Sequence, residues 1–472
     1  MRANRANPVL AAYLTLAVCA LALLPWAARA GGPLLVGGFE GLAGVPFTWD
    51  PAVPVPYRVD GGPFAAKPGG IVTVDNTTGL ARVQAMFKVW QDVPTASISF
   101  SYAGPIQSSA GFTDGNVDTV EEYNAVVASC NSGAQSPFMF DADGSIFYQL
   151  TGESALIGFS GPCLLDPATS RFLSGMGMFN GRFRDGINDP YAYPANYEMT
   201  AAEMDEVIAH EFGHFIGLDH SQLNPEVLTQ PFLNCLVNDL AGLPLMFPYA
   251  TCQARVTAGL PMLAPDDLAW LSKLYPETAN APPTKVPFNT VYGTIRGTIL
   301  FSDGQTHAQG LNVVARDTLQ PKRIGVSVFS GYLFTVYPGQ SITGGDNPAS
   351  PFGSLDPLVV GEYDMLVPAG SYHVWVKSFS PLLEGATFST LYPPIPNPGS
   401  DEYWDSAESA TDSLTAKTAI VISAGAERRD INIILNGTPP RFDSFESARL
   451  WLNEPLPAWR REEDLIPCEV EA

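Results

Sequence analysis

Basic side chains are scarce in this sequence. Its 472 residues include 25 Lys and Arg against 48 Asp and Glu, and the formal net charge is −23. No cluster of Lys and Arg interrupts this acidity. Recognition of nucleic-acid phosphates or of an anionic membrane depends on such clusters. The composition therefore excludes nucleic acid and anionic lipid surfaces as expected partners, and it is compatible with a soluble protein outside the cytoplasm.

Long apolar runs are absent beyond the N-terminal segment. The one such run, Val9 to Leu24, follows Arg2 and Arg5 and precedes the small-residue sequence 28–30 (Ala-Arg-Ala). This order is typical of a secretory signal peptide. We predict cleavage after residues 1–30 and an extracellular location, with the periplasm as a second option. A membrane anchor is the alternative, but no basic stop-transfer cluster follows, and no later segment is long enough to span a bilayer.

Cysteine is also rare, with six residues in the whole chain. Five of them follow the predicted signal peptide, and in an oxidising compartment some should pair. We predict disulfides between Cys130 and Cys163 and between Cys235 and Cys252, with Cys468 left free. Spacing does not fix the connectivity, and unpaired buried thiols are the alternative.

Glycine and proline are abundant, with 43 and 42 residues, which favours short elements joined by turns. In the first half of the chain, apolar residues at helical spacing predict a helix over 78–91. A second helix is expected after Thr200, which has capping-box spacing to Glu203. A third should begin at Pro265, a residue suited to the first helical position, and end near Tyr275. Strands are predicted at 57–59, 97–102, 145–150 and 175–179.

The composition changes after residue 276. Residues 277–288 are rich in proline and are predicted to form a linker. Over 289–436 only strands and turns are expected, which is typical of an antiparallel β-sandwich. Strands are predicted there at 294–301, 311–315, 362–367, 372–377 and 431–435. Residues 437–472 form an acidic tail. The predicted fold is thus an α+β domain over 31–276, with a mixed sheet and three helices, followed by the β-sandwich.

Histidine is the residue type that carries the functional signal. Only five histidines occur, and His210, His214 and His220 lie within eleven positions. His210 and His214 fall on one face of the predicted helix, so two imidazoles can reach one ion. Gly217 allows a sharp turn that returns His220 as a third ligand. Three protein ligands with a fourth position open for water are the mark of a catalytic zinc site, so we expect one Zn²⁺ per chain.

Glu211 is expected to be the catalytic residue of this site. It neighbours His210 and can face the metal without ligating it. Zinc lowers the pKa of water toward roughly 7, and Glu211 would take the proton as water attacks a peptide carbonyl and pass it to the leaving amine. Two alternatives remain, namely a core helix with incidental histidines and a copy that binds metal without activity.

The extended histidine motif, followed by Ser221, resembles that of the metzincin metallopeptidases and, within them, the matrixins, the family of the matrix metalloproteinases. Residues 245–249 (Leu-Met-Phe-Pro-Tyr) resemble the matrixin Met-turn, which implies that Met246 lies beneath the metal. Residues 82–93 and 266–275 are similar to helices of that catalytic domain. The resemblance covers roughly residues 44–276 and implies a secreted zinc endopeptidase that acts on proteins or peptides.

The sequence departs from the matrixin pattern in three ways. Too few residues separate Ala30 from the first predicted strand for an inhibitory prodomain, and none of them is Cys. No histidine precedes His210, so a second zinc held by upstream histidines is excluded. The stretch from His220 to Met246 is longer than usual, so the family's cleavage preferences are not transferred.

Calcium is a further candidate cofactor. Asp141 and Asp143, followed by Gly144, could donate carboxylates to Ca²⁺, as matrixin loops do. A plain hairpin turn is the favoured interpretation, because Asp-Gly is a strong turn signal. His307 and His373 lie far downstream and are expected to be surface or structural residues.

Residues 293–299 and 361–372 resemble carboxypeptidase-regulatory-like β-sandwich modules, which accompany secreted bacterial enzymes. Such a module could bind substrate or a surface, or serve only in folding. The sequence is therefore compatible with two functions. The first is a zinc endopeptidase. The second is a secreted binding or adhesion protein with a catalytically silent metzincin-like domain. The presence of Glu211 favours the first.

Overall fold

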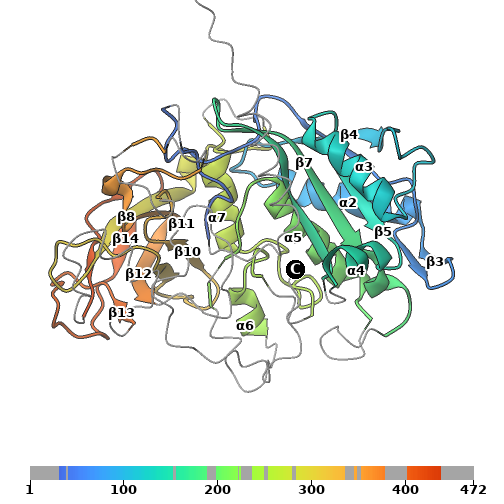
Figure 1. The fold of residues 1–472 in the computed structure, drawn as a ribbon. Coiled ribbons are helices and arrows are strands. Elements are labelled where there is room, and N and C mark those ends of the chain that lie inside the picture. Colours follow the sequence, from blue (N-terminus) through green and yellow to red (C-terminus); the bar gives the residue numbers. More distant parts are fainter. Residues whose placement is uncertain are drawn as a thin grey trace, which may run out of the picture.

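The first half of the chain is built on a five-stranded mixed sheet (Figure 1). The structure is a computed structural model that describes residues 31–38, 41–152, 156–188, 198–221, 223–224, 237–248, 253–278, 283–334, 345–347, 352–377 and 401–436. The sheet order is β4-β1-β5-β7-β6, with only the edge strand β6 antiparallel to its neighbour. Its strands are β1 (Val55–Val59), β4 (Phe100–Pro105), β5 (Pro137–Asp141), β6 (Gly158–Asp166) and β7 (Arg171–Asn180). A small hairpin joins β2 (Ala65–Lys67) to β3 (Ile71–Val74).

Helices cover both faces of this sheet. On one face lie α2 (Asn76–Gln91) and α5 (Ala201–Phe215), and their Phe87 and Phe212 rings stack at 3.8 Å between centroids. Phe138 of β5 packs edge-on against both rings. The other face is covered by α3 (Val120–Asn131) and α4 (Ser145–Thr151), which pack with Met139 of β5 in a second apolar cluster. Successive side chains of β5 point to opposite faces of the sheet, so Phe138 belongs to the core on one face and Met139 to the core on the other.

The second half consists of strands in two further sheets. One has the order β10-β9-β12-β13, with β14 also paired to β12, and the other has the order β11-β8-β15, with β16 also paired to β8. The pairs β9–β10, β9–β12 and β8–β11 are antiparallel, whereas β15 and β16 run parallel to β8. This arrangement is compatible with a β-sandwich. The strands are β8 (Tyr292–Leu300), β9 (Asn312–Asp317), β10 (Gly325–Phe329), β11 (Glu362–Pro368), β12 (Gly370–Lys377), β13 (Glu402–Tyr403), β14 (Ile420–Ile422), β15 (Glu427–Arg428) and β16 (Ile433–Ile434).

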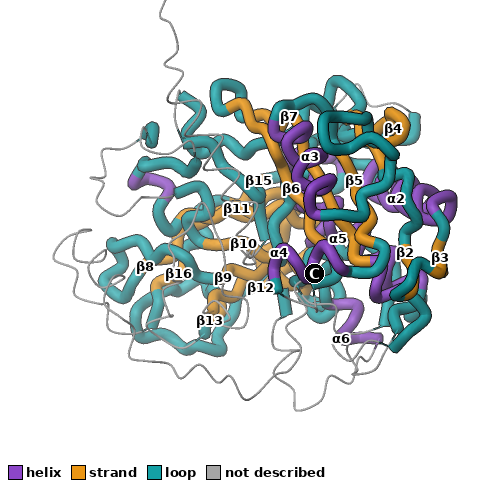
Figure 2. Tube along the Cα trace, turned by 45° about the vertical axis from the view of Figure 1, so that its right-hand side comes forward, coloured by secondary structure: helices purple, strands orange, loops and turns teal. Residues whose placement is uncertain are grey.

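Helix α7 (Pro265–Leu274) lies between the two halves (Figure 1). Figure 2 shows the strands β8 to β13 of the second half beside the helix-rich first half. The indole of its Trp270 donates to the carbonyl of Ser327 on β10 at 2.9 Å. Its Lys273 contacts Asp364 of β11 at 2.7 Å and lies over the Tyr332 ring. Burial pushes the pKa of Asp364 up, but Lys273 and its neighbours outweigh burial and lower it to about 2. An ionised carboxylate therefore anchors α7 to the second half.

Residues 277–288, the predicted linker, include a part that is hydrogen-bonded to the first half. The amides of Glu277 and Val286 donate to the carbonyls of Thr95 and Pro94. The ammonium of Lys285 donates to the carbonyl of Gln91, the last residue of α2, and to that of Val93 just beyond it. The short α6 (Val237–Gly242) and the 3₁₀ turns η1 (Gly181–Arg184), η3 (Phe288–Thr290) and η4 (Pro357–Val359) complete the elements.

The three helices predicted from spacing and caps are present as α2, α5 and α7. The strand predicted at 145–150 is wrong, because that segment is helix α4, entered through Gly144 at φ 76°. The hairpin expected at Asp141–Gly144 is wrong for the same reason, since β5 leads into a helix. Residues 145–150 contain four apolar side chains in a run too short to distinguish the period of a helix from that of a strand. In the structure the Asp141 carboxylate accepts the Phe147 amide at the start of the helix.

The predicted disulfide between Cys130 and Cys163 is confirmed and links α3 to β6. It closes the second apolar cluster, in which both residues are buried. Cys235, Cys252 and Cys468 lie outside the described residues, as do the predicted signal peptide and the acidic tail. Within the described ranges, no helix combines the length and the apolar character needed to cross a bilayer.

Candidate metal centre

Helix α5 presents two histidines from a firmly fixed segment. Its N-terminus carries the predicted capping box, in which the Thr200 hydroxyl accepts from the Glu203 amide while the Glu203 carboxylate accepts from the Thr200 amide. From Val207 onward every residue of the helix is buried. His210 and His214 therefore lie one turn apart with little freedom to move.

The third histidine returns to the helix through a turn at Gly217. This residue has φ 91°, a left-handed conformation that favours glycine. The amide of Leu218 donates back to the carbonyl of Gly213 at 2.8 Å and ends the helix. The turn is also paired with the N-terminal segment, since the Leu34 amide donates to Gly217 and the Asp219 amide donates to Gly32. These bonds fix the path that leads to His220.

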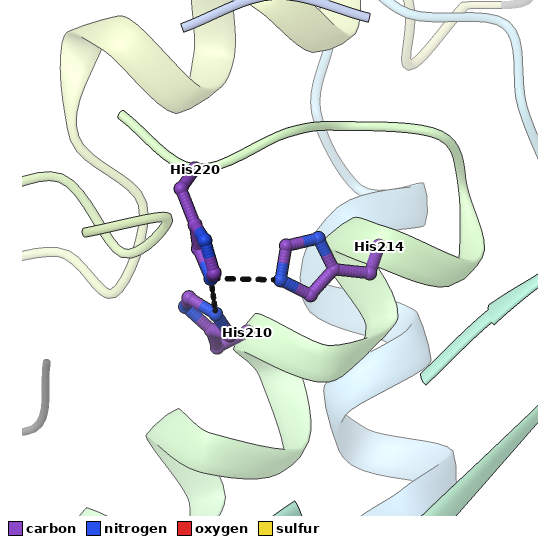
Figure 3. A group of neighbouring side chains, drawn as sticks. All are labelled: His210, His214 and His220. Atoms are coloured by element: carbon purple, nitrogen blue, oxygen red, sulfur yellow. Dashed lines mark hydrogen bonds between the residues drawn. The ribbon is translucent and has the colours of Figure 1, made fainter. Parts of the chain in front are cut away.

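The three imidazoles converge through their Nε2 atoms (Figure 3). Nε2 of His220 lies 3.0 Å from Nε2 of His210 and 3.0 Å from Nε2 of His214. The Nδ1 atoms of the two helical histidines face backbone carbonyls, those of Leu245 at 2.7 Å and Leu218 at 2.9 Å. A carbonyl only accepts, so each Nδ1 carries the proton and each Nε2 presents a lone pair to the centre.

This donor set fits a metal ion. Burial lowers the pKa of His210 to about 4 and that of His214 to about 3, and it lowers that of His220 well below its usual range. The lowered pKa values favour the neutral imidazole, which is the form that ligates a metal ion. A tetrahedral ion with bonds of about 2.0–2.1 Å separates its ligand nitrogens by about 3.3 Å, which is close to the observed spacing. The group could hold one metal ion.

Glu211 adds a buried carboxylate beside the triad. Its side chain is 1% exposed, and its Oε1 has no hydrogen-bond partner in the structure. Burial raises the pKa of this carboxyl to about 8. Burial of a carboxyl group without a hydrogen-bond partner costs folding free energy, and such groups are found mainly at functional sites. A neighbouring cation would lower the pKa of this carboxyl and favour its ionised form. Glu211 is thus a buried carboxyl on the helix that carries His210 and His214, and its Oε1 is free of hydrogen bonds.

Met246 lies directly against the helix between the two histidines. A Cβ built on Gly213 would collide with Sδ of Met246, so glycine is required at this point of the motif. The carbonyl of Met246 accepts the amide of Ser221 at 2.7 Å, next to His220. Met246 therefore packs against the helix between His210 and His214 and is hydrogen-bonded to the loop that carries His220.

Asp267 of α7 holds the segment of Leu245 and Met246 in place, and sequence reasoning missed its role. Its carboxylate accepts the amides of Leu245 and Met246 at 2.8 and 3.0 Å, besides that of Ala264 at 2.7 Å at the start of its own helix. Leu245 in turn supplies the carbonyl for His210. The sequence signal at Asp267 indicated only a helix N-terminus, because its other partners lie more than twenty positions upstream.

The remaining predicted ligands lie elsewhere. Asp141 and Asp143 are at the entry to α4, where they accept the amides of Phe147 at 2.7 Å and Ser145 at 3.1 Å. Their proposed calcium stays a prediction. His307 faces the carbonyl of Val360 at 2.6 Å, and His373 lies near the Tyr403 ring. In the described part of the chain neither belongs to a metal-ligating group.

No protein-family model matches this chain, and no curated protein matches its sequence significantly. The site is therefore interpreted from its own geometry.

Proposed function

We propose that the chain is a secreted zinc endopeptidase with a matrixin-like catalytic domain over 31–276. The observation that carries the proposal is the convergence of the imidazole Nε2 atoms of His210, His214 and His220. Glu211, on the helix that carries the first two, has a buried Oε1 without a hydrogen-bond partner. Imidazole donors with this spacing suit zinc. Met246 beneath the helix and α7 behind it support the same assignment.

The residues of the site have separate tasks in this mechanism. Zinc held by the three Nε2 atoms would supply Lewis-acid activation of water and of the scissile carbonyl. The Leu245 and Leu218 carbonyls hold the His210 and His214 rings in the tautomer that leaves Nε2 free. Oε1 of Glu211 takes the proton of the attacking water and delivers it to the leaving amine.

The edge strand β6 offers a place for an extended peptide. Among the described strands, β6 pairs only with β7, so its other edge can accept a further strand. The strand begins at Gly158, where an added Cβ would lie 3.2 Å from Cγ of Glu211. A substrate paired along this edge would pass the general base with its backbone extended. This geometry favours internal peptide bonds over chain ends.

The test compares mature protein from Gly31 onward with the variant Glu211→Gln, which keeps the shape of the side chain and removes its basicity. Zinc content is measured by elemental analysis, and cleavage is followed on a mixed peptide library. We expect one zinc per chain in both proteins, and cleavage sensitive to chelators in the wild type only. His307→Gln is the matched control, since this histidine lies in the strand region, and it should leave both readouts unchanged.

Zinc binding without cleavage in the wild type would contradict the peptidase assignment and favour the binding or adhesion function. Absence of zinc from the wild type would refute the metal centre itself. Equal turnover in Glu211→Gln and wild type would exclude Glu211 as the base.

A further inference from the structure

A second group of acidic side chains gathers in the C-terminal strands, far along the chain from the histidines. Asp405, Glu408 and Asp412 each offer one carboxylate oxygen, and these oxygens all lie within 4.8 Å of one another. They belong to the loop that follows β13. Carboxylates at this separation repel one another unless protons or a cation intervene, so the cluster alone shows only that something must compensate it.

Glu402 on β13 supplies the observation that points to a ligand. This residue is 2% exposed, and its Oε1 has no hydrogen-bond partner. Its Oε2 accepts the amide of Asn436 at 3.0 Å, while the side-chain amide of Asn436 donates to Asp412 at 2.8 Å. Glu402 and Asp412 therefore bond the same asparagine, and the charge of Glu402 acts on Glu408 as that of Asp412 acts on Glu402. Oδ1 of Asn436 is likewise buried without a partner.

The cluster receives only backbone and amide N–H groups. Glu408 accepts the amides of Asp405 and Ile434, each at 2.8 Å. Asp412 accepts the amide of Ser409 at 3.0 Å. Among the described side chains, no Lys, Arg or His forms an ion pair with any of the four acids. Burial, followed by the charges of neighbouring acids, raises the pKa of both Glu402 and Glu408 to about 7.

We propose that Asp405, Glu408, Asp412 and Glu402, with the side-chain oxygen of Asn436, form a binding site for one calcium ion. All the available donors are oxygens, the ligands that a hard cation prefers, and none is a nitrogen or sulfur that would select zinc. Five donor residues that include carboxylates able to bind through two oxygens can satisfy the six to eight ligands that calcium takes.

The ion would join segments from both sheets of the second half. Glu402 lies on β13, which pairs with β12. Asn436 follows β16, which pairs with β8 of the other sheet. The remaining ligands lie on the loop between β13 and β14. Calcium would thus close this loop onto the last described strand and stabilise the second half independently of the histidine triad.

The test uses the zinc-loaded mature chain and terbium as a luminescent substitute for calcium. Tyr403 and Trp404 adjoin Asp405 in sequence and would sensitise terbium bound there. We expect terbium luminescence that calcium displaces, and a melting temperature that rises with calcium concentration. Glu408→Gln combined with Asp412→Asn should weaken calcium binding about 10-fold or more. Asp430→Asn, an exposed acid of the same strand region, is the matched control and should bind calcium like the wild type.

A second measurement protects the test against misfolding of the double variant. In calcium-free buffer with zinc supplied, its melting temperature should equal or exceed that of the wild type, because two repelling carboxylates are gone. The proposal is overturned if the wild type shows neither calcium-displaceable luminescence nor a calcium-dependent melting temperature. It is also overturned if the double variant keeps the wild-type affinity, since the ion would then be bound elsewhere, for example at Asp141 and Asp143.

Discussion

Replacing Asp267 with Asn is expected to damage the metal centre without touching a ligand. Asn keeps one oxygen, which can still accept the amides of Leu245 and Ala264 in place of Oδ2. Its NH₂ group then faces the amide of Met246, where Oδ1 now accepts at 3.0 Å. One charge-assisted hydrogen bond is lost and a buried N–H is left without an acceptor, which together cost about 2–4 kcal/mol of unfolding free energy.

The same change should lower zinc affinity. Leu245 positions the carbonyl that fixes the tautomer of His210, and loss of such a supporting contact typically weakens metal binding about 10–100-fold. Zinc affinity is measured by competition with a chromogenic chelator, and stability by urea unfolding. Asp92→Asn, which removes an exposed partner of Lys88, is the control and should cost at most about 0.5 kcal/mol. Wild-type zinc affinity in Asp267→Asn would refute the role assigned to this carboxylate.

Two further predictions concern packing and pH. Gly213→Ala should lower the melting temperature and the zinc content, because the new Cβ meets Met246 and approaches Trp90 Cζ2 at 3.3 Å; overpacking of this kind costs about 1–3 kcal/mol, and a variant with unchanged zinc content would contradict it. Burial raises the pKa of Asp141 to about 7, so its stabilising contribution is complete below the unfolded pKa of about 4 and is lost as the pH rises through 7. The unfolding free energy of Asp141→Asn relative to wild type should therefore rise by roughly 2 kcal/mol between pH 5 and pH 8. Urea unfolding at both pH values measures this difference, and an equal difference at the two pH values would contradict the prediction.

The parts of the fold that could be predicted are those with local signals. The capping pair Thr200 and Glu203 marked α5, and Pro265 marked α7. Spacing alone brought His210, His214 and His220 together, because a helix and one glycine turn determine their relative positions. Such features depend on contacts within a few residues of the chain, so the sequence contains nearly all of the information.

Two failures came from local signals that were misread or overlooked, and the others came from contacts between distant parts of the chain. Helix α4 was predicted as a strand, although its entry is set by Asp141 and Gly144. Helix α3 was missed, yet Thr119 accepts the Glu122 amide at its N-terminus, and this capping spacing could have revealed it. The acidic group around Glu408 was not recognised, because Glu402 and Asn436 reach it from distant strands. No local pattern could have identified the tertiary partners of Asp267.

The C-terminal strands help to hold the loop that carries His220. Ser221, next to His220, lies with its hydroxyl 3.2 Å from that of Ser327 on β10. The amide of Ser327 donates to Asp266 of α7 at 2.8 Å. The loop of the third histidine is therefore held between a helix of the first half and a strand of the second. The metal centre proposed at this junction would therefore need both halves to be folded, and Asp266 and Ser327, which link them, are buried.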